Sequence, residues 1–332
     1  MRIHGDLVRT DAPPLTQDDI EQLVGTVLNE DRKALFKKRL DIDLSYATSF
    51  ARFRVNVFRQ QDNTGAVFRV IPFAIKSLDE LVVPPAIKEM AMRTRGLLLV
   101  TGPTGSGKST TLAAAIDHIN TNKRVNVVTI EDPIEFIHED KLSSINQREV
   151  GEDTNSFASA LKHVMRQNPD VILVGEMRDL ETIQLAVTAA ETGHLVLSTV
   201  HTTDAAQTID RIVDVFPPEQ QRQIRTQLSL TLLGILSQTL LPRADVPGRV
   251  AAFEVLVVTP AIRSLIRDGK THQVAGDIQT GSQFGMQTLD SSLLELVRQK
   301  IVRFEEALAK SSNPREFEQR AAAFRDQAPA QL

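Results

Sequence analysis

The segment GPTGSGKST, residues 102–110, has the residue types and the spacing of a phosphate-binding loop. It follows the apolar run GLLLV and precedes TLAAAIDHI, so we expect a buried strand before it and a helix after it. Glycines allow backbone amides to turn toward a phosphate group, and a helix that begins here adds the positive end of its dipole. The candidate binding residues are Gly102, Thr104, Gly105, Ser106, Gly107, Lys108, Ser109 and Thr110.

Two side chains of this loop have specific chemistry. Lys108 is expected to neutralise charge on the β- and γ-phosphates, and Ser109 is expected to place its hydroxyl on Mg²⁺. A glycine-rich turn without a ligand is the alternative interpretation. The complete match to G-x-x-x-x-G-K-[ST] between a strand and a helix favours ATP as the ligand instead.

Glutamates follow two further apolar runs, where strands of a parallel sheet would end. VNVVTI leads to Glu135, and VILVG leads to Glu176. Ligands of open α/β sheets lie at the carboxyl ends of strands, so both glutamates are candidates for catalysis. We assign the Mg²⁺-linked carboxylate to Glu176 and favour Glu135 as the group that activates water. For either glutamate alone, a helix N-cap or a solvated loop charge is the alternative.

Two histidines flank the strand predicted within HLVLSTVH, residues 194–201. Seven residues along a strand put His194 and His201 on opposite faces, and the chain has no cysteine, so we exclude a metal site built on them. His201, followed by two threonines at the ligand end, is better placed to sense the γ-phosphate. Capping of the strand ends is the alternative interpretation for His194.

Arginines gather on a hairpin that is predicted nearer the start of the chain. Arg52 and Arg54 share one face of ARFRVNVFRQ, and Arg69 lies on the partner strand. A solvated sheet face is the simplest interpretation. With an ATP site in the same chain, arginines supplied by a neighbouring subunit become a second one, since such groups stabilise the charge of the transition state.

The elements that must position these residues fall into distinct regions. A helical pattern and the hairpin are typical of a small α+β domain. After a segment with a proline pair, short β-rich runs alternate with helical patterns, which predicts an α/β fold with a mostly parallel sheet and helices on both faces. The expected parts are a domain over 1–75, a linker over 76–95, an ATPase domain over 96–312 and a polar tail over 313–332 that frays.

The composition excludes several classes of protein. A net charge of −4 and 5% aromatic residues argue against a nucleic-acid partner, because such a protein needs basic and stacking surfaces. The start of the chain has no apolar core of a secretion signal, and the longest apolar stretch, LTLLGILSQTLL, is too short to span a bilayer. We therefore expect a cytoplasmic protein.

Four ordered motifs resemble those of the secretion-type hexameric ATPases that power type IV pili and type II secretion. GPTGSGKSTTLAA is similar to their Walker A element, TIEDPIEF to the Asp box, RQNPDVILVGEMRD to Walker B, and TGHLVLSTVHTTDAAQTIDRI to the His box. AIRSLIRDGK and IQTGSQFGMQTLD resemble the carboxy-terminal elements of the retraction ATPases of twitching motility. The assembly ATPases usually have a four-cysteine zinc element, which this chain lacks.

The resemblance implies a RecA-like ATPase domain preceded by a smaller PAS-like domain, in a homohexamer at the inner-membrane base of a pilus machine. It implies an inner-membrane platform protein as partner, with the ATPase peripheral to the membrane. Glu135 matches the Asp-box glutamate, Glu176 the Walker B glutamate, and His194 and His201 the His-box pair. Arginines that match Arg54 and Arg69 reach phosphate in the family. The chain begins at a point inside the family's first domain, so its first helix and strand are expected to be absent.

Three other functions remain open at this level. One is pilus assembly or type II secretion by the same kind of ATPase. Another is a RecA-like nucleic-acid translocase, which DNA-stimulated hydrolysis would support. The third is an ATP-dependent docking module whose hydrolysis is vestigial. For the predicted helix AIRSLIRD, the like-charged pair Arg263 and Arg267 indicates a surface that meets an acidic partner, and solvated surface charge is the alternative.

Overall fold

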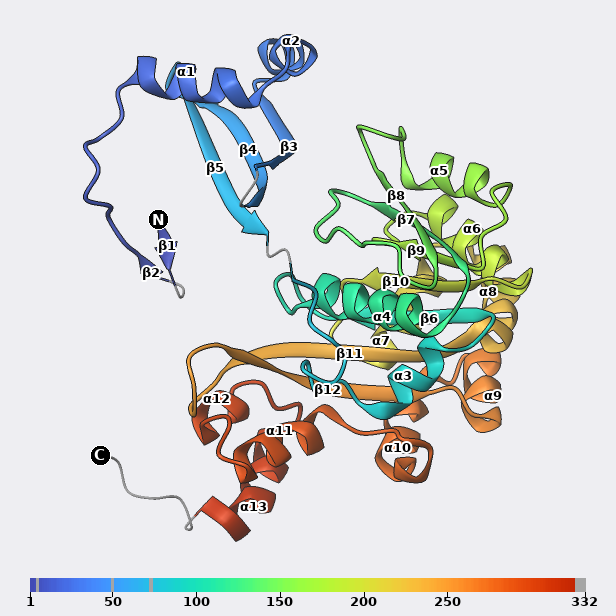
Figure 1. The fold of residues 1–332 in the computed structure, drawn as a ribbon. Helices are drawn as coiled ribbons and strands as arrows, with labels where there is room; N and C mark the ends of the chain where they lie inside the picture. Colours follow the sequence, from blue (N-terminus) through green and yellow to red (C-terminus); the bar gives the residue numbers. More distant parts are fainter. Residues whose placement is uncertain (4–5, 49–50, 72–73, 326–332) are drawn as a thin grey trace. The chain divides into compact units, whose positions relative to one another are not determined.

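The computed structural model describes residues 1–3, 6–48, 51–71 and 74–325, and these form two compact units (Figure 1). The first unit comprises Met1–Ala74 together with Pro133–Ile137. The second comprises Ile75–Asp132 and His138–Leu332. The chain therefore leaves the second unit briefly, just after the apolar run VNVVTI, and then returns to it.

The first unit has an antiparallel sheet in the order β3-β4-β5, with two helices packed on one face. Val24 and Phe36 from the helices and Val55 from the central strand belong to one buried cluster. The elements are β1 (Arg2–Ile3), β2 (Asp6–Leu7), α1 (Gln17–Val27), α2 (Glu30–Arg39), β3 (Asp41–Ala47), β4 (Arg52–Gln60) and β5 (Asn63–Ile71).

Local sequence explains where these elements begin and end. Thr16 and Asp19 form a capping box at the start of α1, and the Asn29 side chain accepts from the amide of Arg32 at the start of α2. The helical pattern expected before the hairpin is therefore two helices, because Asn29 starts a second one. The predicted hairpin is confirmed: β4 and β5 are joined through Gln61 and Asp62, both with positive φ as a tight two-residue turn requires.

The second unit is built on a seven-stranded sheet in the order β12-β11-β6-β10-β9-β7-β8. All neighbours are parallel except the β11–β12 pair, so the predicted α/β class with a mostly parallel sheet is confirmed. The strands are β6 (Gly96–Thr101), β7 (Asn126–Glu131), β8 (Ser144–Glu149), β9 (Val171–Val174), β10 (Leu195–Val200), β11 (Leu232–Pro242) and β12 (Arg249–Val257).

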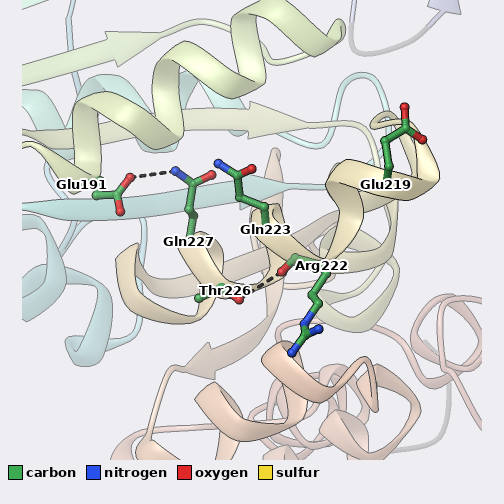
Figure 2. Close-up of a pocket in the computed structure, with 6 residues that line it drawn as sticks. All are labelled: Glu191, Glu219, Arg222, Gln223, Thr226 and Gln227. Carbon is green, nitrogen blue, oxygen red and sulfur yellow. Dashed lines mark hydrogen bonds between the residues drawn. The ribbon is translucent and has the colours of Figure 1, made fainter.

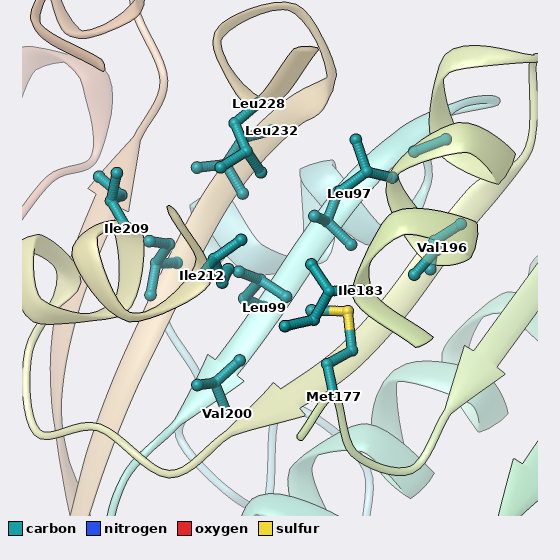
Figure 3. Close-up of a cluster of buried hydrophobic side chains, with 14 of the residues drawn as sticks. Leu97, Leu99, Met177, Ile183, Val196, Val200, Ile209, Ile212, Leu228 and Leu232 are labelled. Carbon is teal, nitrogen blue, oxygen red and sulfur yellow. The ribbon is translucent and has the colours of Figure 1, made fainter. Parts of the chain in front are cut away.

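Helices cover both faces of this sheet, as predicted (Figure 1). Helices α3 and α4 bury one face, while α5 to α10 bury the other in the largest apolar cluster, part of which Figure 3 shows. The helices are α3 (Pro85–Ala91), α4 (Lys108–Asn122), α5 (Phe157–Val164), α6 (Leu180–Glu191), α7 (Ala205–Asp214), α8 (Pro218–Thr231), α9 (Pro260–Asp268), α10 (Val274–Thr280), α11 (Leu289–Arg298), α12 (Phe304–Leu308) and α13 (Pro314–Arg325).

Two parts of the chain differ from the sequence-based expectation. The segment 76–95, expected as a linker, contains α3 and contributes Leu78 and Ile87 to the core of the second unit. The segment from 313, expected as a polar tail that frays, instead forms α13, because Phe317 and Ala321 are buried against α11 and α12. Residues 326–332 of that expected tail lie outside the described residues.

No helix in the described ranges is both long enough and apolar enough to cross a membrane.

Candidate functional site

The loop between β6 and α4 has a backbone that only glycine adopts readily. Gly102, Gly105 and Gly107 have φ angles of 143°, 80° and 92°. A Cβ atom on Gly102 would also lie 2.3 Å from the backbone oxygen of Gln238. Because Gly107 is the N-cap of α4 and carries no side chain, the first amides of this helix are left to meet another acceptor. These features are those of a loop that surrounds a phosphate group.

Lys108 points back into this loop. Its side chain is largely buried, at 8% exposure, and its Nζ donates to the carbonyl oxygens of Gly102, at 2.8 Å, and Pro103, at 3.0 Å. Thr104 and Ser109 are exposed, Thr110 is half-buried and Ser106 is buried. The ammonium group is thus held inside the curve of the loop, where a bound phosphate would meet it.

Gln238, which the sequence did not indicate, fixes the loop from the neighbouring strand. Its Nε2 donates to the backbone oxygen of Ser106 at 2.7 Å, and its Oε1 accepts from the hydroxyl of Thr111 at 2.9 Å. This buried amide therefore joins the loop to the first turn of α4. Only the pairing of β11 with β6 brings it there, so no local pattern could have revealed it.

Glu176 and His201 lie together at the carboxyl ends of β9 and β10. His201 Nε2 is 3.6 Å from Glu176 Oε2, and the same oxygen accepts from Arg178 Nε at 2.7 Å. Burial, followed by the positive charge of Lys108, lowers the pKa of His201 below its usual 6.5, against an opposing effect of Glu176. The charge of Lys108 in the loop therefore disfavours the protonated form of His201.

Two hollows in the second unit have different surroundings. One, of about 330 Å³, is lined by Thr104 of the loop, by Arg178 and His201, and by side chains of α6 and α7. The other, of about 520 Å³, lies along α8 and is lined by residues with polar or charged side chains (Figure 2). The residues of the larger hollow are Glu191, Glu219, Arg222, Gln223, Thr226 and Gln227, none of which belongs to the phosphate loop or its strand ends. The smaller hollow is therefore the one that adjoins the candidate site.

His194 is not part of this constellation. It precedes β10 whereas His201 follows it, so the two lie about 20 Å apart at about 3.3 Å per residue. Its Nδ1 is 2.9 Å from the backbone oxygen of Ala189, at the end of α6. The structure therefore favours the capping interpretation for His194 and places only His201 at the ligand end.

The remaining candidates belong to the first unit. Arg54 and Arg69 are direct cross-strand partners on β4 and β5. They lie on the face of the sheet opposite Val55, which belongs to the apolar cluster under α1 and α2. Neither arginine side chain is therefore part of that core. Glu135 is half-buried in the segment Pro133–Ile137, which groups with the same unit.

Glu254 is a second residue that the sequence did not indicate. It is a partly buried carboxylate on β12, and its Oε1 accepts from the backbone amide of Ala205 at 2.8 Å. Burial raises its pKa to about 7, and the charges of Asp204 and Asp290 act in the same direction, against the amide hydrogen bond. Packing of the core does not explain why an ionisable group with this pKa lies next to the segment that carries His201.

Comparisons with known proteins agree with this geometry. The family described as "Type II/IV secretion system protein" matches residues 38–247. The chain is 49% identical to the "Twitching motility protein" of Neisseria gonorrhoeae, over 94% of this chain and 84% of that protein. It is 50% identical to the "Type IV pilus retractation ATPase PilT" of Pseudomonas aeruginosa, over 96% of this chain and 92% of that protein.

A solved structure shares the fold. The pilus retraction motor PilT with bound ADP superposes with a TM-score of 0.88 and is 46% identical, with 96% of this chain and 91% of that chain covered. The predicted combination of a RecA-like domain with a smaller PAS-like domain is confirmed by this likeness and by the two units described above.

Proposed function

The chain belongs to the family of type II/IV secretion system proteins, and from this premise we propose that it is an ATP-hydrolysing motor that retracts type IV pili and thereby powers twitching motility. The observation that carries the proposal is the 50% identity to a retraction ATPase along 96% of the chain. The loop geometry supports it, because Gly102, Lys108 and the start of α4 have the arrangement that phosphate binding requires.

ATP is bound by its phosphates to this loop. Backbone amides of residues 104–110 and the ammonium group of Lys108 surround the β- and γ-phosphates, while Gln238 keeps the loop in shape. A bound nucleotide would exchange the two neutral carbonyl acceptors of the Lys108 ammonium for negatively charged phosphate oxygens, which are stronger acceptors. Binding is therefore compatible with the loop as it stands.

The donor groups fit a magnesium ion. Ser109 offers an exposed hydroxyl at the first turn of α4, and Glu176 offers a carboxylate at the end of β9. Mg²⁺ is usually held by one or two carboxylates together with substrate phosphates, and when bound it neutralises charge on the transferred group. Within the described residues, no cluster of three or more acidic or histidine side chains would hold a metal by itself, which is consistent with this shared mode.

Hydrolysis also needs groups that orient water and respond to the γ-phosphate. We assign the first role to Glu135 and the second to His201, whose ring nitrogen can donate a hydrogen bond to a phosphate oxygen. Glu176 holds His201 and Arg178 in place through one carboxylate oxygen. His194 is left out of this mechanism.

Arg54 and Arg69 contribute positive charge to the transition state. Like charges directly opposite each other in an antiparallel pair are unfavourable unless an anion lies between them, and phosphate is such an anion.

We expect Arg69→Ala to reduce hydrolysis more than it reduces stability. Mixing Arg69→Ala subunits with Lys108→Ala subunits tests where the arginine acts. Recovery of ATPase activity in the mixture would show that it acts on a neighbouring subunit, and an inactive mixture would show that it acts within one chain.

The motor is a homohexamer at the inner-membrane base of the pilus machine, in the cytoplasm, with a membrane platform protein as partner. Closed rings arise when one surface of a subunit binds a different surface of the next, and a site completed by a neighbour's arginine would need such contacts. We place the partner surface on α9, where Ile262 and Ile266 are buried while Arg263 and Arg267 are exposed.

Deleting the gene is expected to leave pili on the cell surface and to stop twitching, and the wild-type gene is expected to restore movement. Complementation with Arg263→Glu and Arg267→Glu together should not restore it, because reversed charge would repel an acidic partner. The purified double variant should assemble and hydrolyse ATP at a rate close to that of the wild type, since both side chains are exposed. Normal twitching would remove the surface from the mechanism, and lost hydrolysis would make α9 a support of the ATPase fold.

A further inference from the structure

The segment that carries His201 is held at three points. Residues 201–204 join β10 to α7, and the hydroxyl groups of Thr202 and Thr208 are 2.7 Å apart. The Asp204 side chain accepts from the amide of Gln207, as an N-cap does. The third point comes from outside the segment and its helix: the amide of Ala205 donates to Glu254 of β12.

Glu254 lies on the strand that leads into α9. After β12 ends at Val257, Thr259 caps α9, which begins at Pro260 (Figure 1). The register pairs Glu254 with Ser237 of β11, and the Ser237 hydroxyl accepts from Thr101, the last residue of β6 before the phosphate loop. The carboxylate is thus next to the His201 segment, is separated from β6 by the single strand β11, and is close in sequence to α9.

This carboxylate is costly where it stands. The group is partly buried, and the two charged groups that act on it are also carboxylates: Asp204, the N-cap of α7, and Asp290 of α11. Ionisable groups with pKa values shifted in this way gather at functional sites, so the contact with Ala205 marks Glu254 as a candidate for a functional role.

From the contact with Ala205, and building on the proposed ATPase motor, we propose that Glu254 is a positioning residue. It ties the His201–Asp204 segment to β12, so that a nucleotide-dependent shift of that segment reaches α9. The residue touches neither substrate nor reacting atoms in this proposal. It acts through the backbone amide of Ala205 on one side and through strand β12 on the other.

Two substitutions of Glu254 test whether its hydrogen-bond acceptor, and not the rest of its side chain, is required. Glu254→Gln keeps an oxygen that can accept from Ala205, whereas Glu254→Ala removes it. We expect the alanine variant to lower kcat about ten- to a hundredfold, the scale set by small misplacement of catalytic groups, with KM little changed. The glutamine variant should keep kcat close to that of the wild type. Val255→Ala is the matched control, because it truncates a fully buried neighbour that packs on the opposite face of β12.

A spectroscopic reporter tests the connection to α9. The chain has no tryptophan, so Leu265→Trp on the partly buried side of α9 gives a single tryptophan, which can be excited apart from Tyr46. Its emission should differ between ADP and a non-hydrolysable ATP analogue, keep that difference with Glu254→Gln and lose it with Glu254→Ala. No nucleotide-dependent difference in the Leu265→Trp protein would overturn the connection to α9.

The possible outcomes distinguish failure of this proposal from failure of the proposed motor function on which it rests. If the wild-type protein does not hydrolyse ATP, the proposed motor function fails. If it does, and Glu254→Ala retains both kcat and the fluorescence difference, only the role of Glu254 fails. Equal losses of kcat in Glu254→Ala and Val255→Ala, at equal thermal stability, would show that lost packing explains the effect and would also overturn the proposal.

Discussion

Replacing Lys108 by alanine is expected to abolish ATP turnover, with a loss of about a thousandfold or more, the scale on which one phosphate-facing cation acts in phosphoryl transfer. The Nζ atom lies inside the curve of the loop, at 2.8 Å from the carbonyl oxygen of Gly102, and no other lysine or arginine belongs to residues 102–110. Charge that develops on the γ-phosphate would lose its main fixed counter-charge. Phosphate release by the purified protein is the measurement.

A second variant separates charge from packing. Lys108 is largely buried, so alanine also removes a side-chain stem, whereas Lys108→Met keeps most of that volume and removes only the charge. Both should be inactive and should melt close to the wild type. Lys123→Ala, at the other end of the same helix, is the matched control and should hydrolyse ATP normally. An active methionine variant would show that the stem, and not the charge, supports catalysis.

The sequence predicts the phosphate site so well because its physics is local. Positive φ at Gly102, Gly105 and Gly107 follows from residue type, and the apolar runs on either side predict the strand and the helix. The strands that precede Glu176 and His201 could likewise be predicted from continuous apolar runs, as is typical of strands buried on both faces. The carboxyl ends of adjacent parallel strands then necessarily meet.

Other features depend on contacts between distant segments, which no local pattern contains. Gln238 and Glu254 lie on β11 and β12, and their partners Ser106 and Ala205 are known only once the strands are paired. β8 has no apolar run that would indicate a strand, because its residues SINQRE are mostly polar, as an edge strand allows. The helix α13 was missed for a related reason: a mostly polar segment is held by Phe317, whose burial depends on α11 and α12.

The roles of Glu135 and Glu176 also depend on information that spacing does not hold. Both follow apolar runs that form strands, so both were equivalent candidates. The structure distinguishes them: Glu176 lies within the second unit in contact with Arg178 and His201, while Glu135 belongs to a segment that groups with the first unit. Substitution of each by glutamine is therefore the decisive comparison.

Glu135→Gln and Glu176→Gln are each expected to bind ATP and to hydrolyse it about a hundredfold more slowly or worse, as when a base or a metal-linked carboxylate is lost. Glutamine keeps the shape of the glutamate side chain and one acceptor oxygen. A loss of hydrolysis therefore shows that the negative charge or proton transfer is required. The two should differ in their dependence on Mg²⁺. Glu176→Gln should need more magnesium for half-maximal activity, since this carboxylate is assigned to the ion, whereas Glu135→Gln should not.

Glu295→Gln is the matched control, because this carboxylate on α11 accepts from Arg298 Nε at 2.8 Å and from Gln299 at 2.6 Å and lies outside all four motifs. It should hydrolyse ATP within about twofold of the wild type, as for a surface-near carboxylate outside the reacting groups. Normal hydrolysis by Glu135→Gln together with an inactive Glu176→Gln would exchange the roles and make Glu176 the group that activates water. The contact of Glu176 with His201 would then couple water activation directly to the residue that senses the γ-phosphate.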